Sequence, residues 1–508
     1  MIIRVMRLRA LLLVAPLAAC SERVSAPRDA TANVDVMRAD VALDASADAS
    51  DTDVDTVSVR TCSELRLGAI TAAPGGLLAA YPGSRLALTG DDLAVIDRVS
   101  VGGVEVTFER EGDAVITHVP PMLAPGEQTV VVANERCSAS RAITVSRLLA
   151  QIPREGGRVT LLDWARLDAA GALDTGLSSI VQGQFTVDGR ALVLRDRDGR
   201  VAVSWLAPMR TTTLTLRARG PFALAWGTVV PTQALLAVPT GMPSGLLRVD
   251  TDATAVTPYE GPANDPIGVA TTLDGFRALV LDQGGVGYAL DRPFARTPAW
   301  SRFGDFTTVR SPAEIVLEQG AAVTIHGPLA AVYDATDPPA VLPMDSLTGT
   351  LGERLEVPGA AGGMYFLSGD VVAMDATTPE VITADITALT GIVSREPLEG
   401  ESPTGVVRTH TAATLYRVGA VALRMSASGV PEGDSLHVFD FHREPAVEER
   451  RVMIAGLRGV AGIQGAGDPF AVWTARAVMR VRGTDGERVV ERAVPAAEGE
   501  VGFVVVPR

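Results

Sequence analysis

Residues 185–194 read FTVDGRALVL, and residues 272–281 read TLDGFRALVL. Each stretch predicts a strand, an Asp-Gly turn and a second, apolar strand, because Asp-Gly tolerates the positive φ of a tight hairpin turn. Another turn follows in both places, at Asp196-Arg197-Asp198-Gly199 and at Gln283-Gly284-Gly285, and it leads into a third strand. The common unit is therefore a run of antiparallel strands joined by short turns.

This unit recurs about every 43 residues over the C-terminal two-thirds of the chain. Its second strand is expected near Leu148, Ala191, Ala234, Ala278, Ala321, Tyr365, Ala413 and Ala471. Its third strand is expected to end in an aspartate at Asp163, Asp250, Asp291, Asp334 and Asp375, with Trp205-Leu206 in the matching place of the second unit. Repeats of ~40–45 residues with four strands each are typical of the blades of a β-propeller.

The two ends of the repeat region complement each other. The first unit, Leu148 to about Gly176, lacks a preceding inner strand, and the last strand, Val501–Val506, lacks a hairpin of its own. Pairing them would close the ring and remove open sheet edges. We therefore expect eight blades over residues 148–508, with seven blades as the alternative. A sandwich array or a β-solenoid is the competing architecture.

The repeats resemble the WD40/YVTN group, whose Trp-Asp dipeptide falls at the aspartate position just described. This chain lacks the usual Gly-His and mostly lacks the Trp, so the resemblance implies the propeller shape and not the eukaryotic subfamily.

The first twenty residues have the pattern of an export signal. Arg4, Arg7 and Arg9 precede an apolar run that ends Leu17-Ala18-Ala19-Cys20, and that run is too short to span a bilayer comfortably. The ending resembles the lipobox of bacterial lipoproteins. The resemblance implies acylation of Cys20 and cleavage before it, and Ser21 in place of Asp favours the outer membrane. An ordinary secretory signal is the alternative.

Residues 21–61 predict a disordered tether. Aspartates are spaced among alanine, serine and threonine, and no aromatic residue occurs, so the segment buries too little to offset its ordering entropy. Asp51, Asp53 and Asp55 have calcium-loop spacing, but Thr56 and Cys62 stand where such a loop needs Gly and Glu. A solvated spacer is expected instead.

Residues 62–147 predict a small sandwich. Short β-rich runs at 85–90, 98–106, 114–117 and 128–133 alternate with turn signals, as in immunoglobulin-like folds. Pro82-Gly83-Ser84, Thr89-Gly90, Val101-Gly102-Gly103 and Val119-Pro120 resemble the IPT/TIG family of surface proteins. With Cys20 lipidated, Cys62 and Cys137 remain as an even pair in an oxidising compartment. We expect a Cys62–Cys137 disulfide, with two free thiols as the alternative.

Composition excludes several classes of chemistry. The formal charge is −15, so nucleic acid is not an expected partner. The chain contains no lysine, which removes Schiff-base, pyridoxal-phosphate and P-loop chemistry. The histidines are His118, His326, His410, His437 and His442. Only His437 and His442 are close in sequence, and five residues apart on a strand they face opposite sides, so we interpret them as a solvated strand edge.

Other candidate sites are weak. Gly433-Asp434-Ser435-Leu436 spells the GDSL hydrolase motif, but it is late in the chain and flanked by strands, whereas that family places it early in an α/β domain. Trp164, Trp205, Trp226, Trp300 and Trp473 are expected to be packing residues, and Arg296, Arg302 and Arg310 to be solvated loop cations.

The sequence therefore predicts an all-β chain: an immunoglobulin-like sandwich followed by a propeller, lipid-anchored in the cell envelope. We expect a non-catalytic platform for a protein or glycan partner, without cofactor or metal. A propeller enzyme with a channel site and a structural spacer are the alternatives. The oligomeric state is left open.

Overall fold

The computed structural model divides the chain into two units, Met1–Val59 and Arg60–Arg508, and only residues of the second are described here. These are residues 65–506, apart from 73–79, 121–122, 124–125, 207–208, 227–229, 242–244, 273–275, 284, 306–311, 318–328, 346–347, 368–370, 387–390, 415, 442–446 and 463–469. The expected signal, tether and Cys20, as well as Cys62, lie outside the described residues.

The N-terminal part of the described chain is a pair of four-stranded antiparallel sheets. One has the order β1 (Arg66–Ala72), β2 (Arg85–Asp91), β6 (Ala114–His118) and β5 (Glu109–Glu111). The other has the order β4 (Val104–Val106), β3 (Arg98–Val101), β7 (Gly126–Ala133) and β8 (Ser138–Val145). Alternating apolar side chains of both sheets, among them Leu88 and Val130, pack in one core. Burying one face of each sheet in this way makes a sandwich.

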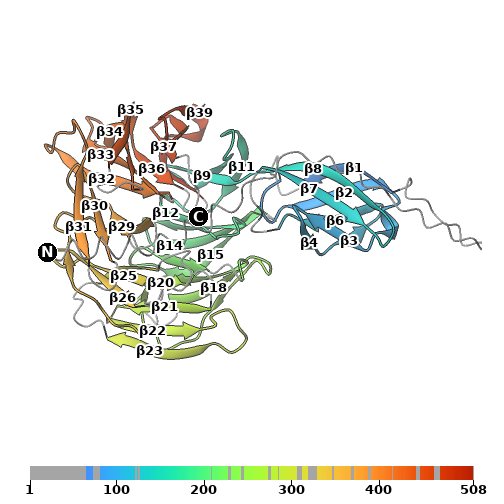
Figure 1. The fold of residues 1–508 in the computed structure, drawn as a ribbon, viewed down its shortest axis with the longest axis horizontal. Coiled ribbons are helices and arrows are strands. Elements are labelled where there is room, and N and C mark those ends of the chain that lie inside the picture. The colour runs from blue at the N-terminus through green and yellow to red at the C-terminus, as the bar shows by residue number, and fades with distance from the viewer. Residues whose placement is uncertain are drawn as a thin grey trace, which may run out of the picture. The chain divides into compact units, whose positions relative to one another are not determined.

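Over the remaining described residues, eight consecutive four-stranded antiparallel sheets follow (Figure 1). Each sheet is given from its inner strand outward. The first sheet contains β40 (Val501–Val505), β9 (Leu148–Pro153), β10 (Arg158–Asp163) and β11 (Ala169–Asp174), and the second contains β12 (Ile180–Phe185), β13 (Ala191–Asp196), β14 (Arg200–Leu206) and β15 (Met209–Arg217). The third sheet contains β16 (Ala223–Trp226), β17 (Gln233–Ala237), β18 (Leu246–Asp250) and β19 (Ala255–Pro258), and the fourth contains β20 (Pro266–Thr271), β21 (Arg277–Asp282), β22 (Val286–Asp291) and β23 (Ala299–Asp305). The fifth sheet contains β24 (Pro312–Leu317), β25 (Leu329–Asp334), β26 (Ala340–Asp345) and β27 (Leu355–Glu356), and the sixth contains β28 (Tyr365–Leu367), β29 (Val371–Met374), β30 (Glu380–Asp385) and β31 (Ile392–Pro397). The seventh sheet contains β32 (Val406–Ala413), β33 (Arg417–Met425), β34 (Pro431–Asp440) and β35 (Val447–Leu457), and the eighth contains β36 (Gly459–Gly462), β37 (Phe470–Trp473), β38 (Ala477–Val481) and β39 (Arg488–Ala493).

Burial explains the sequence pattern of these sheets. The second strands are almost continuously apolar and buried, as β9 and β13 are, because neighbouring sheets cover both of their faces. Val193 of β13 and Leu236 of β17, for example, belong to one core between two successive sheets. The outer strand β15 instead alternates between half-buried and exposed side chains, as expected for a strand at a solvated edge.

The inner strands touch one another around a closed ring. Contacts run from β16 through β20, β24, β28, β32 and β36 to β40, and from β40 to β12. Side-chain amides join β12 to β16: Gln182 Nε2 donates to Phe222 O at 2.8 Å, and Gln184 Nε2 donates to Leu224 O at 3.3 Å. In Figure 1 the colours follow this circuit, and the red last sheet lies next to the teal first one. The described chain is therefore all-β and contains a β-propeller.

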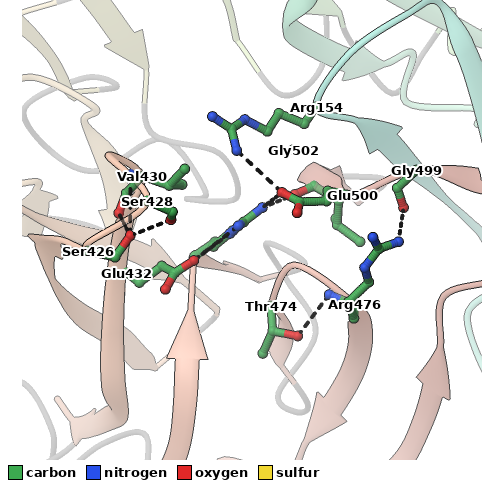
Figure 2. Close-up of polar contacts among 12 residues, drawn as sticks. Arg154, Ser426, Ser428, Val430, Glu432, Thr474, Arg476, Gly499, Glu500 and Gly502 are labelled. Carbon is green, nitrogen blue, oxygen red and sulfur yellow. Dashed lines mark hydrogen bonds and ion pairs between the residues drawn. The ribbon is translucent and has the colours of Figure 1, made fainter. Parts of the chain in front are cut away.

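The ring closes as the sequence predicts. The C-terminal strand β40 pairs antiparallel with β9, Val504 opposite Gln151 and Val505 opposite Ala150. Ion pairs reinforce the closure: Glu500 accepts hydrogen bonds from Arg154 at 3.3 Å and from Arg458 at 3.0 Å (Figure 2). Arg458 also donates to Glu432 of β34 at 3.0 Å, so one guanidinium connects the seventh sheet to the closing strand. The hydrogen bond from Arg458 holds the pKa of Glu500 below the ordinary glutamate value.

The expected phase of the repeat is wrong in the fifth to seventh sheets. Their second strands begin, in that order, at Leu329, Val371 and Arg417, not near Ala321, Tyr365 and Ala413. Tyr365 and Ala413 belong to the inner strands β28 and β32, and Ala321 lies outside the described residues. Asp334 accordingly ends a second strand, β25, and Asp375 follows another, β29, rather than ending third strands. A fixed step fails here because surface connections vary in length much more than strands do.

The two helices described are short 3-10 turns, η1 (Leu93–Val95) and η4 (Ala496–Glu498). In the part of the chain that the structure describes, no helix has the length and apolar character needed to cross a bilayer.

Candidate functional site

A cavity of about 490 Å³ lies among the inner strands near the point where the ring closes. Its walls come from β12, β28, β32, β36 and β40, with Leu423 of β33 and Trp473 of β37 behind them. Its volume is in the range of small-molecule sites. We call it the channel cavity.

Strand β32 gives the channel cavity an arginine and a histidine. Arg408, His410 and Ala412 all line it, because alternate residues of a strand face the same side. The intervening Thr409 and Thr411 are buried. The Cα atoms that carry the guanidinium and the imidazole are therefore about 7 Å apart along the strand.

Arg408 is held in place by a buried carboxylate. Its Nη2 donates to Oδ2 of Asp375, which is 0% exposed, while the Arg408 side chain itself keeps 45% of its surface exposed. Asp375 Oδ1 accepts two more hydrogen bonds, from the backbone N–H and the hydroxyl of Thr411, both at 2.7 Å. Burial alone would lower the pKa of Arg408, but the Asp375 charge raises it above the ordinary arginine value, so the cation persists at any physiological pH.

His410 is a neutral hydrogen-bond donor beside this cation. The backbone N–H of Val460 donates to its Nδ1 at 3.2 Å, which leaves the proton of the neutral ring on Nε2. Burial, assisted by the Arg408 charge and opposed by Asp375, holds the pKa of His410 below the ordinary histidine value. At neutral pH the ring is therefore uncharged.

Aromatic rings form part of the cavity wall. Tyr365, Trp473 and Phe503 line it, and Trp473 meets His410 edge-on, with ring centroids 6.0 Å apart. Trp473 is nearly buried, and its indole N–H donates to Gly502 O at 3.2 Å. Trp164, Trp205 and Trp226 are buried as well, and Trp300 packs edge-on against Tyr259 and Tyr288. The interpretation as packing residues is confirmed for Trp164, Trp205, Trp226 and Trp300, whereas Trp473 is packed and also lines the cavity.

A second polar cluster lies two strands away in the same sheet. On β34, Ser435 Oγ lies 2.9 Å from His437 Nε2, and His437 Nδ1 lies 3.0 Å from Glu448 Oε1 on β35. Ser435 also donates to Glu401 Oε1 at 2.7 Å. We call these four residues the Ser435–His437 cluster. They have the residue types and hydrogen-bond distances of a serine nucleophile with its base and orienting carboxylate.

The Ser435–His437 cluster is sealed. Ser435 is 1% exposed and His437 is 0% exposed, and none of the four residues lines the channel cavity. The interpretation of His437 as part of a solvated strand edge is therefore wrong. Its ring is buried between the carboxylates of Glu401 and Glu448, and both ring nitrogens have hydrogen-bond partners there, so burial leaves neither nitrogen unsatisfied. His442 lies outside the described residues.

Glu401 ties this cluster to the segment that leads into β32. Arg424 Nη1 donates to its Oε2 at 2.7 Å, and Arg451 lies 3.7 Å from its Oε1. Burial favours the neutral acid, yet hydrogen bonds from Ser435, Arg424 and His437 hold the pKa of Glu401 below the ordinary value. The cluster is thus a satisfied hydrogen-bond network that joins β34 and β35 to the segment before β32.

The remaining sequence candidates do not converge. Arg296 and Arg302 are exposed, His118 is exposed at the end of β6, and His326 and Arg310 lie outside the described residues. Cys137 donates its backbone N–H to Asn134 Oδ1 at 2.8 Å, and its pairing with Cys62 stays a prediction. Among the described residues, no group of three or more His, Cys, Asp or Glu is placed to hold a metal ion.

The sandwich has a cavity of its own, of about 680 Å³. Asp91, Asp92 and Asp113 line it together with Arg66 and Arg110, and no aromatic residue does. Its mixed charges and its lack of aromatic side chains make it a poorer candidate site than the channel cavity.

Sequence reasoning did not single out Arg408 or His410 as a pair. The signal was available in the segment Arg408-Thr409-His410-Thr411-Ala412, in which Arg408 and His410 alternate with two threonines, as on a strand that has one open face. Recognising it required the knowledge that β32 is an inner strand, which the 43-residue step misplaces.

No family model and no curated protein matches this chain. Similar solved structures include the dihydro-heme d1 dehydrogenase NirN in complex with DHE (12% identity, 70% of this chain and 74% of that chain, TM-score 0.48). They also include Kuenenia stuttgartiensis hydrazine synthase (14%, 60% and 95%, 0.41) and the RRP9 WD40 repeats (11%, 65% and 94%, 0.40). At these identities and TM-scores the likenesses say nothing of ligand or activity. The propeller is evident from the sheet order and the ring of inner strands.

Proposed function

We propose that this chain is a lipid-anchored protein of the cell envelope whose propeller binds a protein or glycan partner without catalysis. The observation that carries the proposal is the channel cavity, which holds hydrogen-bonding and aromatic side chains around an open space. The Ser435–His437 cluster, which has the residues for hydrolysis, is sealed away from that space. A nucleophile without access to substrate supports binding over turnover.

The proposal includes the finer architecture. The eight sheets are eight blades, and the sandwich is an immunoglobulin-like module related to the IPT/TIG family. Support comes from four strands per sheet in all eight sheets and from the two-sheet core of the sandwich. Fold alone fixes no ligand, so binding must be tested at the cavity.

The test fills the channel cavity and asks whether partner capture is lost. Ala412 lines the channel cavity, and Ala94 lines the sandwich cavity. The full chain is immobilised and exposed to solubilised envelope from the organism that encodes it. We expect one component to be captured by the wild type and by the matched control Ala94→Phe, and lost at least tenfold with Ala412→Phe. Melting temperatures check that both variants fold. Capture unaffected by Ala412→Phe, or turnover in a broad hydrolase and lyase screen, would overturn the proposal.

The anchor is tested separately. Residues Leu17-Ala18-Ala19-Cys20 support acylation of Cys20, and acyl chains at ~0.8 kcal/mol per buried methylene hold a soluble body at a membrane. We expect Cys20→Ser to move the protein from the outer-membrane fraction to the soluble fraction and to remove the lipid mass from its N-terminal peptide. Unchanged fractionation would contradict the anchor and leave the cavity proposal standing.

A further inference from the structure

The charged side chains that line the channel cavity in the described part of the chain are basic, although the molecule as a whole is acidic. The chain has a formal charge of −15, with 60 acidic and 45 basic side chains. Among the described residues that line the cavity, two are arginines, one is a histidine and none is acidic. Carboxylates behind the wall pair with both guanidiniums, Asp375 with Arg408, and Glu432 and Glu500 with Arg458. The lining therefore attracts an anion through N–H donors that are still free rather than through a net positive field.

The two arginines are not equivalent. Arg458 is 6% exposed, and its guanidinium is occupied by Glu432, Glu500 and the carbonyl of Val501, so it serves the ring closure. Arg408 has a single hydrogen-bond partner among the described residues, Asp375, at one of its five N–H groups. Arg408 is the cation with donors to spare, and Asp375 and Thr411 hold it in position before any ligand arrives.

The donors beside Arg408 suit a carboxylate. A guanidinium presents parallel N–H groups that match the two oxygens of a carboxylate. His410 lies two residues further along β32, on the same face. Because the backbone N–H of Val460 donates to its Nδ1, the ring proton is on Nε2, which is a neutral donor and not an acceptor. No carboxylate in the described lining competes with an incoming anion.

Apolar side chains form much of the remaining wall. Gln182 and Gln184 also line it, but their side-chain amides donate to Phe222 O and Leu224 O. Leu423, Val460, Phe503 and Val505 line the cavity with Trp473. A fully hydrated inorganic anion would leave this surface wet, whereas an organic anion with an apolar body would bury it, at about 25 cal/mol per Å². Space of about 490 Å³ holds such a molecule.

We propose that the channel cavity binds a small organic carboxylate, with the carboxylate on Arg408 and His410 and an apolar body against Trp473 and Phe503. This assignment rests on the proposed binding function and gives it a ligand class. The carboxylate can be carried by a free small molecule or by a terminal group of the envelope partner, since both offer the same chemistry.

The test compares two probes that differ only in charge. 2-Naphthoate and its neutral isostere 2-naphthamide are titrated into the full chain by calorimetry and by tryptophan fluorescence. We expect naphthoate to bind at least tenfold more tightly than naphthamide. In Arg408→Gln that ratio falls to about one, and in Arg395→Gln it is unchanged, because Arg395 pairs with Glu380 away from the cavity. The double variant Arg408→Gln/Asp375→Asn, which leaves no buried unpaired carboxylate, is expected to behave as Arg408→Gln does and to retain the wild-type melting temperature more closely.

Three results of this titration would overturn the carboxylate site. Equal affinity for the two probes, no binding of naphthoate at 10 mM (about −2.7 kcal/mol), or a ratio that survives in both Arg408 variants overturns the carboxylate site. D-Glucuronate, a carboxylate on a hydroxylated body, is expected to bind at least tenfold more weakly than naphthoate, and tighter binding would overturn the apolar half of the assignment. The capture experiment with Ala412→Phe is independent, so the carboxylate site can fail while the binding function stands.

Discussion

Two histidines of one sheet have opposite surroundings. His410 on the inner strand β32 lines the channel cavity beside a half-exposed arginine, whereas His437 on β34 is 0% exposed and hydrogen-bonded at both nitrogens. His437 has the residue types of a catalytic triad around it, and His410 has none. The comparison teaches that access and spare hydrogen-bonding capacity, not residue types alone, distinguish a site from a structural network.

The largest expected effect comes from removing β40, the strand that closes the ring and forms part of the wall of the channel cavity. Deletion of residues 501–508 removes β40, which lines the cavity and pairs with β9. Val501, Val504 and Val505 are buried, and at about 1.5 kcal/mol per buried valine their loss costs about 4–5 kcal/mol before the opened ring is counted. We expect a large fall in melting temperature by calorimetry. Deletion of 507–508 alone is the control, and an unchanged melting temperature for the longer deletion would refute ring closure.

The second prediction addresses the sealed side. His437→Ala leaves Glu401 and Glu448 without a shared partner, and breaking a buried ionic network by removing one member costs about 3 kcal/mol. We expect a lower melting temperature and, in the fraction that stays folded, unchanged affinity for the cavity ligand. His118→Ala, at an exposed histidine of β6, is the matched control. Wild-type stability with impaired binding would reverse the roles assigned to the two histidines.

The propeller could be predicted from the sequence because its signals are local. Asp-Gly turns, continuous apolar runs such as Ala191–Leu194 and the unpaired end strand 501–506 each follow from backbone geometry within a few residues. The strand phase was lost after Ala278, where connections lengthen, because loop length is not constrained by the core. The all-β class therefore survives errors in register that displace individual strands.

The candidate site could not be predicted in the same way. Arg408 meets Asp375, and His410 meets Val460, across three different sheets, and no spacing in the sequence encodes such contacts. Ser435 and His437, two residues apart, were in view, but the carboxylates that complete their network come from a loop and from β35. Burial of that network depends on neighbouring segments, which a motif does not describe.

The smallest expected effect concerns the ionisation of His410. Its folded-state pKa is lowered by burial, so below the ordinary pKa of about 6.5 the unfolded chain binds a proton that the folded chain refuses. Stability is therefore unaffected above that pH and falls as the pH drops from about 6.5 toward the folded-state pKa, by up to about 1.4 kcal/mol for each unit of lowering. His410→Gln keeps a hydrogen-bonding group without a titrating one. Between pH 8 and pH 5 we expect the wild type to lose more melting temperature than His410→Gln, as measured by calorimetry at each pH. Parallel pH profiles for wild type and His410→Gln would show that burial does not lower the pKa of His410 in the folded protein.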